Sequence, residues 1–274
     1  MSETASLDGP VDVETYGPWA LIVGGSEGIG AACARQLAAK GFNIVLTARK
    51  VEPLQALAQE LSGTGALVRY GSVDLSQPDA LDRTRALTDD IDVGLLLYIA
   101  GANDTRGNFL DLDPKVYRSV IAINVIGQTE FARHYGALMR DRGRGGIVLA
   151  GSLSNFLGAA TLAAYTASKA FSRIFTEALW AECAEVNIDV LHVVVGYTDT
   201  PAMRRLGLDT SSAQSPEDAA DEIMASIRKG PLLLLGGEAS LKIATLRSQI
   251  TDRGGLIRTA ATPRRENISH VGKS

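Results

Sequence analysis

Short apolar runs recur along most of the chain, and helical spacing of apolar residues fills most of the stretches between them. The runs, which we predict as strands, lie at 19–23, 43–47, 66–73, 93–99, 146–149, 189–195 and 232–235. Nearly all of them are continuously apolar and do not alternate with polar residues. This pattern is typical of strands in a parallel sheet whose two faces are both covered by helices.

The stretches between the runs predict helices at 54–61, 79–88, 115–139, 164–186 and 216–229, and another that passes through Cys33 and Leu37 and stops at Gly41. Ser215 and Pro216 suit the cap and the first turn of the last helix. The alternation of strand and helix predicts a single-domain, doubly wound α/β fold. We place this domain at 18–254, between a flexible N-terminal tail (1–17) and a mobile C-terminal tail (255–274).

Composition narrows the classes of function. The chain has 274 residues and a formal net charge of −4, which gives no reason to expect nucleic acid or an anionic membrane as partner. Its first residues are acidic, and its apolar runs are far too short to span a bilayer, so we expect a soluble, cytoplasmic protein. The two cysteines and three histidines are scattered, which favours reduced, buried thiols and argues against a metal site.

A glycine-rich segment, GGSEGIG at 24–30, follows the first strand and opens a helix. Glycine permits the tight turn and the approach of a pyrophosphate to the backbone, and the helix N-terminus offers free N–H groups. Glycines also occur in ordinary turns, but the strand–turn–helix context favours the dinucleotide site of a Rossmann fold. We expect cofactor contacts from Gly24, Ser26, Gly28, Ile29 and Gly30.

The second strand is followed by Arg49 and Lys50, where an NAD site carries an acidic residue for the ribose hydroxyls. A guanidinium can hold a 2′-phosphate through two hydrogen bonds, so we expect NADP(H) in preference to NAD(H). Glu27 weakens this preference a little, and solvated loop cations are the alternative. Asp74 and Leu75, after the third strand, are expected at the adenine, but Asp74 suits a helix cap equally well.

Tyr165 and Lys169 are four residues apart and therefore share one face of a helix, although this spacing by itself is common by chance. A cation beside a phenol lowers the phenol's pKa and makes it a usable proton donor near neutral pH. Ser152 lies just after a strand, where its hydroxyl can polarise a substrate carbonyl. Asn124 lies among apolar neighbours in a predicted helix, and its amide suits either the site or a structural hydrogen bond.

Together these residues resemble the short-chain dehydrogenase/reductase family over most of the chain, from residue 19 to about 235. Asn124, Ser152, Tyr165 and Lys169 match its catalytic tetrad in order and spacing. The resemblance implies an oxidoreductase that transfers a hydride between NADP(H) and a carbonyl or secondary alcohol. It also implies cofactor contacts from Tyr165, Lys169, Ala100, Gly101, Gly196, Thr198 and Thr200.

The family mechanism, carried over to these positions, gives each residue a role. Tyr165 protonates the carbonyl oxygen as hydride reaches the carbon, and Ser152 stabilises the developing oxyanion. Lys169 binds the nicotinamide ribose and lowers the tyrosine pKa. Asn124 holds a water that links Lys169 to bulk solvent.

The chain departs from the family pattern at three places. Val23 replaces the usual threonine before the first loop glycine, Tyr98 and Ile99 replace two asparagines after the fourth strand, and Val195 replaces a proline. The lost amides would otherwise stabilise the central sheet and the cofactor edge. These changes bear on cofactor affinity more than on the reaction, because the tetrad is intact.

Segment 201–214 is expected to fold over the substrate, with Met203, Leu206 and Leu208 as apolar contacts; an ordinary exposed loop is the alternative. Phe156 and Leu157 are expected in the same pocket. We expect a mainly apolar ketone or alcohol, acyl or steroid-like, and a homodimer or homotetramer built on the two long helices. Two alternatives stay open: a non-catalytic NADP(H)-binding sensor, and a dehydratase or epimerase on the same fold.

Overall fold

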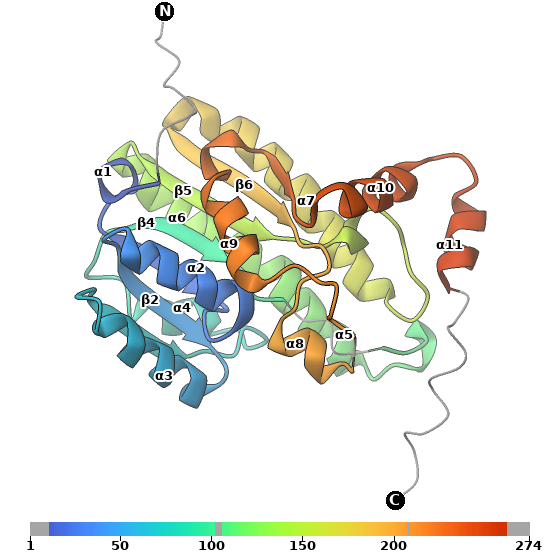
Figure 1. The fold of residues 1–274 in the computed structure, drawn as a ribbon, viewed down its shortest axis with the longest axis horizontal. Helices are drawn as coiled ribbons and strands as arrows, with labels where there is room; N and C mark the ends of the chain where they lie inside the picture. Colours follow the sequence, from blue (N-terminus) through green and yellow to red (C-terminus); the bar gives the residue numbers. More distant parts are fainter. Residues whose placement is uncertain (1–10, 102–105, 208, 262–274) are drawn as a thin grey trace, which may run out of the picture.

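The computed structural model describes residues 11–101, 106–207 and 209–261 of the chain (Figure 1). The described chain forms one seven-stranded sheet with the order β3-β2-β1-β4-β5-β6-β7, in which every neighbouring pair is parallel. The strands are β1 (Trp19–Val23), β2 (Asn43–Ala48), β3 (Val68–Ser72), β4 (Val93–Tyr98), β5 (Gly145–Ala150), β6 (Ile188–Val194) and β7 (Leu232–Leu234). All seven predicted strands are present, and the strand order reverses between β1 and β4.

Helices cover both faces of the sheet, and each face has its own apolar core. On one face the core joins the sheet to α2 (Gly28–Ala39), α3 (Val51–Ser62) and α9 (Pro216–Met224), which lie in front of the strands in Figure 1. On the other face it joins the sheet to α4 (Ala80–Arg85), α6 (Gln128–Arg142) and α7 (Ala163–Cys183). The predicted doubly wound Rossmann fold is confirmed, because burial on both faces is what the continuous apolar runs require.

The predicted helix at 115–139 is present but is not α-helical throughout. It consists of α5 (Pro114–Ile121), a π-helical turn (Ala122–Gly127) and then α6. The Tyr98 hydroxyl, from the end of β4, donates a 2.7 Å hydrogen bond to the carbonyl of Ile123 inside this turn. A Cβ at Gly127 would collide with the same hydroxyl, so glycine is required there. Short π-helical turns inside helices occur frequently at functional sites, and this one carries Asn124.

The first described residues are bonded to the rest of the protein, although the sequence predicted a flexible N-terminal tail there. α1 (Val13–Tyr16) is capped by Asp12, whose Oδ1 accepts a hydrogen bond from the backbone N–H of Thr15. Tyr16 is buried and donates a 2.7 Å hydrogen bond to Asp189 on β6. The expected loose tail is therefore wrong for residues 11–17, and residues 1–10 lie outside the described chain.

The C-terminal part contains two helices that the sequence did not predict, α10 (Gly237–Ser248) and α11 (Arg253–Ala261). The expected domain end at residue 254 falls inside α11, so residues 255–261 are helical and not irregular, and residues 262–274 lie outside the described chain. The remaining elements are α8 (Pro201–Arg205) and the 3₁₀ turns Phe109–Asp111, Leu153–Asn155, Ala184–Val186 and Ile227–Lys229. Ser215 caps α9 as expected, through the backbone N–H of Asp218.

Among the described residues, no helix has the length and apolar character needed to cross a bilayer. Within the same ranges, no group of three or more His, Cys, Asp or Glu side chains could hold a metal ion. Cys33 and Cys183 are both buried, free thiols, as predicted.

Candidate active site

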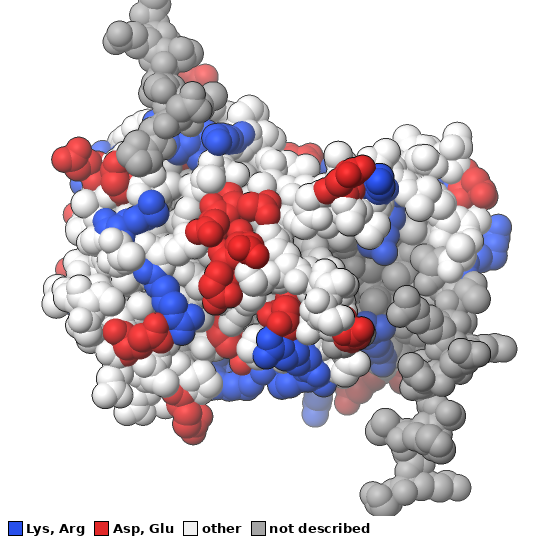
Figure 2. Space-filling model, viewed as in Figure 1, with Lys and Arg blue, Asp and Glu red and all other residues white. Residues whose placement is uncertain are grey.

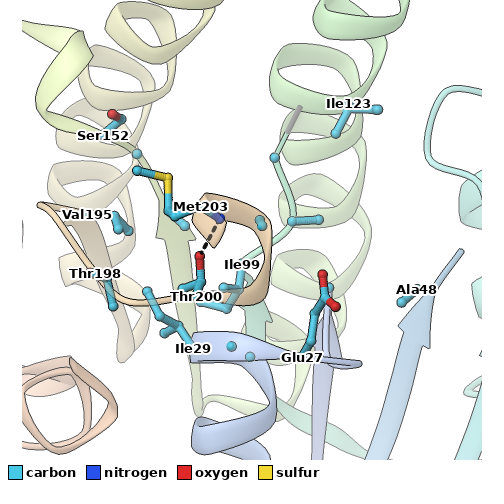
Figure 3. Close-up of a pocket in the computed structure, with 18 of the residues that line it drawn as sticks. Glu27, Ile29, Ala48, Ile99, Ile123, Ser152, Val195, Thr198, Thr200 and Met203 are labelled. Atoms are coloured by element: carbon cyan, nitrogen blue, oxygen red, sulfur yellow. Dashed lines mark hydrogen bonds between the residues drawn. The ribbon is translucent and has the colours of Figure 1, made fainter. Parts of the chain in front are cut away.

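A cavity of about 710 Å³ opens at the carboxyl ends of the strands, where the strand order reverses (Figure 3). Parallel α/β sheets bind their ligands at this position. The residues predicted for cofactor or catalysis that line it are Gly24, Ser26, Gly28, Ile29, Gly30, Arg49, Leu75, Ala100, Gly101, Ser152, Tyr165, Lys169, Gly196, Thr198 and Thr200. Fifteen of the seventeen predicted positions therefore meet in one cavity; Asp74 and Asn124 do not line it.

The glycine-rich segment forms the floor of one end of this cavity. Gly24 has a φ of +88°, and a Cβ there would lie 2.6 Å from the backbone nitrogen of Ala100. Gly28, with a φ of +56°, is the first residue of α2. The N-cap residue Glu27 makes no side-chain capping bond, so the first N–H groups of α2 are left for a ligand. The arrangement fits a pyrophosphate approaching the helix N-terminus.

Glu27 is the centre of an ion-pair group at this end. Its Oε2 lies 3.0 Å from Nη1 of Arg205 on α8 and 3.7 Å from Nζ of Lys50. The hydrogen bond from Arg205 lowers the pKa of the Glu27 carboxyl. The Arg49 side chain forms no ion pair with a described residue, and it lines the same cavity. In Figure 2, basic side chains gather around α8, whose last turn carries Arg204 and Arg205.

Asp74 closes the turn after β3 and does not cap the helix that follows. Its Oδ1 accepts hydrogen bonds from the backbone N–H of Ser76 (2.9 Å) and from the Ser76 hydroxyl (2.8 Å). The carboxylate thus closes the turn after β3, while α4 begins later, after Asp79. The contact of Asp74 with adenine stays a prediction.

Lys169 and Tyr165 lie side by side on α7, as their spacing predicted. The Lys169 Nζ is 5.9 Å from the centroid of the Tyr165 ring. Only 3% of Lys169 is exposed, and its ammonium donates a 3.1 Å hydrogen bond to the carbonyl of Ala150, the last residue of β5. Burial lowers the pKa of Lys169 to about 8. The site therefore holds a buried cation, with its pKa lowered by burial, beside a phenol ring.

Ser152 is held by an extension of the sheet beyond β5. The backbone N–H groups of Gly151 and Leu153 donate to the carbonyls of Val193 and Val195, at 2.7 and 3.1 Å. The Ser152 hydroxyl oxygen accepts a 3.1 Å hydrogen bond from the Ser154 N–H. Its own proton therefore remains for donation to a ligand oxygen in the cavity.

Asn124 is fully buried and lies one layer behind the cavity wall. Its Nδ2 donates to the Ser168 hydroxyl at 3.0 Å, and that hydroxyl donates to the carbonyl of Tyr165 at 2.7 Å. A Cβ on Gly101 would lie 3.5 Å from Asn124 Oδ1 and 3.1 Å from Lys169 Nζ. Asn124 thus lies close to both Tyr165 and Lys169, and its role in holding a water stays a prediction.

Gln128 is a site residue that sequence reasoning missed. Its Nε2 donates a 3.1 Å hydrogen bond to the carbonyl of Ala150, which also accepts the hydrogen bond from Lys169. Its Oε1 accepts a 2.5 Å hydrogen bond from the Ser172 hydroxyl. Gln128 is fully buried. Nothing in its sequence neighbourhood signals this contact, because the partners belong to β5 and α7.

The substrate side of the cavity is partly as predicted. Met203 and Leu206 line it, and the Met203 N–H donates to the hydroxyl of Thr200, which caps α8 (Figure 3). In the view of Figure 3, Met203 and Thr200 lie between Ser152 and Glu27. Leu208 lies outside the described residues.

Phe156 and Leu157 do not line the cavity, contrary to expectation. The Phe156 ring packs against the Arg173 guanidinium, 5.1 Å from its centroid, and Leu157 is buried. Ser154 and Leu162 line the wall in their place. The turn after Ser152 directs its apolar side chains into the protein, which sequence spacing does not reveal.

Comparison with known proteins gives a consistent picture. Residues 18–211 match the family described as short chain dehydrogenase. The chain is 32% identical over 228 residues to the 7beta-hydroxysteroid dehydrogenase of Clostridium sardiniense, covering 81% of this chain and 87% of that protein. It is 34% identical over 195 residues to the very-long-chain 3-oxoacyl-CoA reductase of Neurospora crassa, covering 69% of this chain and 58% of that longer protein.

A solved structure extends the comparison to the fold. The short-chain dehydrogenase from Sphingobium yanoikuyae in complex with NADPH superposes with a TM-score of 0.75 at 26% identity. The match covers 94% of this chain and 98% of that one. The likeness therefore includes almost every element that surrounds the cavity.

Proposed function

This chain belongs to the short chain dehydrogenase family, and from that premise we propose that it transfers a hydride between NADP(H) and the carbonyl or secondary alcohol of a mainly apolar substrate. The family membership supports an oxidoreductase acting on CH–OH donors. The observation that carries the finer proposal is the meeting of Ser152, Tyr165 and Lys169 in one cavity with the uncapped N-terminus of α2.

The residues present fit a dinucleotide. The glycine-rich segment and the first N–H groups of α2 would hold the pyrophosphate, and Gly101 and Lys169 border the place for the nicotinamide ribose. Arg49 would hold the 2′-phosphate of NADP(H), and the NADPH complex of a similar protein supports this choice. The cofactor, when bound, supplies or accepts the hydride.

The chain's own residues supply the proton transfer and the polarisation. Tyr165 donates the proton to the carbonyl oxygen during reduction, and Ser152 hydrogen-bonds the same oxygen. The Lys169 ammonium stabilises the phenolate that remains, because an opposite charge close by favours the ionised phenol. Asn124 and Gln128 keep the helix α7 and the Ala150 carbonyl in place around that ammonium.

An apolar substrate suits the apolar part of the cavity wall. Leu162, Met203 and Leu206 contribute apolar surface there. The similar proteins with known names act on hydroxysteroids and on very-long-chain 3-oxoacyl-CoA, both of which carry a large apolar body. We therefore keep the steroid-like or acyl ketone as the proposed substrate class.

The outer face of the helices α5 to α7 supports the proposed homodimer or homotetramer. Large apolar side chains are exposed there, including Ile121, Phe171, Ile174 and Trp180. A face of this kind is typical of surfaces that another chain covers. The cytoplasmic location stays a prediction.

The test is turnover of a carbonyl panel followed at the NADPH absorbance band. Steroid ketones and 3-oxoacyl compounds are each offered with NADPH and with NADH, and we expect oxidation of NADPH with at least one class. No turnover with any ketone, together with tight NADPH binding, would refute the enzyme and favour the non-catalytic cofactor sensor.

A further inference from the structure

Arg106 lines the cavity at its catalytic end. The backbone N–H of Gly107 donates a 3.1 Å hydrogen bond to the carbonyl of Thr161, four residues before Tyr165. This contact holds the segment that follows β4 against the start of α7. The Arg106 side chain is exposed, contributes to the cavity wall and forms no ion pair with a described residue.

The described residues that line the cavity carry more basic than acidic side chains. Glu27 is the one acidic side chain among them, and it already forms ion pairs with Arg205 and Lys50 at the phosphate-loop end. Arg49 lies near that end too, since the next residue, Lys50, has its ammonium 3.7 Å from Glu27. A 2′-phosphate would account for Arg49 but not for Arg106, which adjoins the residue bonded to Thr161 at the catalytic end.

Two further guanidinium groups lie behind the same end. Arg247 donates to the carbonyl of Leu153 at 3.1 Å, and Arg253 donates to the carbonyl of Phe156 at 2.9 Å. Both are half-buried and neither is paired with a carboxylate of a described residue. Burial lowers the pKa of Arg247, because no counterion offsets its desolvation. Two guanidinium groups therefore lie against the turn that begins at Ser152 without a carboxylate partner among the described residues.

We propose that the substrate carries an anionic group, bound by Arg106 while its carbonyl lies against Ser152 and Tyr165. This inference rests on the proposed function and narrows it, from any apolar ketone to an apolar oxo compound with a negative charge away from the reacting carbon. The charge has two possible sources, a carboxylate on the apolar body or the phosphates of an acyl thioester. A guanidinium binds either one through paired, charge-assisted hydrogen bonds.

The test compares charged and neutral forms of the same ketone. One arm uses a keto-steroid with a side-chain carboxylate and its methyl ester. The other uses a long-chain 3-oxoacyl-CoA and the corresponding N-acetylcysteamine thioester, which lacks the phosphates. For at least one pair, the wild-type protein should favour the charged member by about tenfold in kcat/KM, through KM. The arm that shows the preference identifies the source of the charge.

Arg106→Gln should remove that preference, with kcat and NADPH affinity unchanged, and Arg106→Lys should keep most of it. Arg118→Gln is the matched control, because Arg118 is an exposed arginine on α5 outside the cavity. Equal kcat/KM for charged and neutral members in both arms would overturn the inference while leaving the proposed function intact. Weaker NADPH binding by Arg106→Gln would also overturn it, because Arg106 would then serve the cofactor.

Binding separates the two claims if no compound turns over. The four compounds are titrated against the NADPH complex by fluorescence quenching. Charge-selective binding that Arg106→Gln abolishes, without turnover, would refute the redox role and support the anion contact. Binding without charge selectivity would refute the anion contact.

Discussion

The hydroxyl of Tyr98 donates a 2.7 Å hydrogen bond to the carbonyl of Ile123, the residue before Asn124. Tyr98 stands where the family pattern has an asparagine, and the sequence alone indicated only a loss of side-chain amides. The fully buried phenol instead bonds the end of β4 to the π-helical turn. Its ring packs edge-on against Phe131, with 5.5 Å between the ring centroids. This departure from the family pattern therefore has a structural role beside the site.

Replacing Tyr98 by phenylalanine tests that role. Tyr98→Phe removes the hydroxyl that donates to the buried carbonyl of Ile123. The loss of this hydrogen bond should lower the free energy of unfolding by about 1–3 kcal/mol in a urea titration. We also expect a severalfold loss of kcat, because the turn that carries Asn124 loosens. Tyr135→Phe is the control, since it removes a similar buried contact, to Thr88 at 2.8 Å, away from the cavity. A loss of kcat as large in the control would show that general destabilisation is responsible.

Arg49 should decide the choice between the two cofactors. Arg49→Asp replaces a partner of the 2′-phosphate by a repelling carboxylate that can accept hydrogen bonds from ribose hydroxyls. The ratio of kcat/KM for NADPH over NADH should fall by at least about tenfold. Arg140→Asp on α6, an exposed substitution outside the cavity, should leave the ratio unchanged. An unaltered ratio in Arg49→Asp would place the 2′-phosphate elsewhere.

Glu27 should act against NADPH affinity. In the described structure its carboxylate forms ion pairs with Arg205 and Lys50, two cations at the same end of the cavity as Arg49. Glu27→Gln should release them and strengthen NADPH binding severalfold, with a smaller effect on NADH and a weaker effect at high salt. Glu52→Gln, on the first turn of α3 outside the cavity, is the control. Weaker NADPH binding would mean that Glu27 mainly holds α8 in place.

The buried ammonium of Lys169 predicts opposite pH trends for activity and stability. Burial lowers its pKa to about 8, so the cation that supports Tyr165 is present below that pH and is lost above it. The kcat/KM for carbonyl reduction should therefore fall as the pH rises through about 8. Between this value and the unfolded value of about 10.4, the unfolded chain binds more protons, so this group adds stability as the pH rises. A reduction rate that does not change across this range would contradict the assignment.

The strands and the catalytic helix were predictable from local patterns. The continuous apolar runs located every strand of the sheet, and the four-residue spacing of Tyr165 and Lys169 placed both side chains on one face of α7. The pairs that sequence missed join distant segments: Glu27 with Arg205, Tyr16 with Asp189, and Gln128 with Ala150. No local pattern encodes such contacts, because each depends on how the layers pack.

The C-terminal helices and the π-helical turn were missed for other physical reasons. Apolar residues lie all around α10, so it shows no amphipathic face, and Gly254 and Gly255 at the start of α11 are typical of loops. The π-helical turn depends on the Tyr98 hydroxyl and on Gly127, which lie on different elements. The two helices therefore lack a local sequence signal, whereas the π-helical turn depends on a tertiary contact.

The most direct test of the whole proposal is Tyr165→Phe, measured on the best substrate of the carbonyl panel together with the NADPH dissociation constant. The variant keeps the ring beside Lys169 and removes only the hydroxyl that donates the proton. We expect turnover to fall by about a thousandfold while NADPH binding stays within about twofold of the wild type. Undiminished reduction by the variant would contradict the assignment of Tyr165 as the proton donor and, with it, the proposed mechanism.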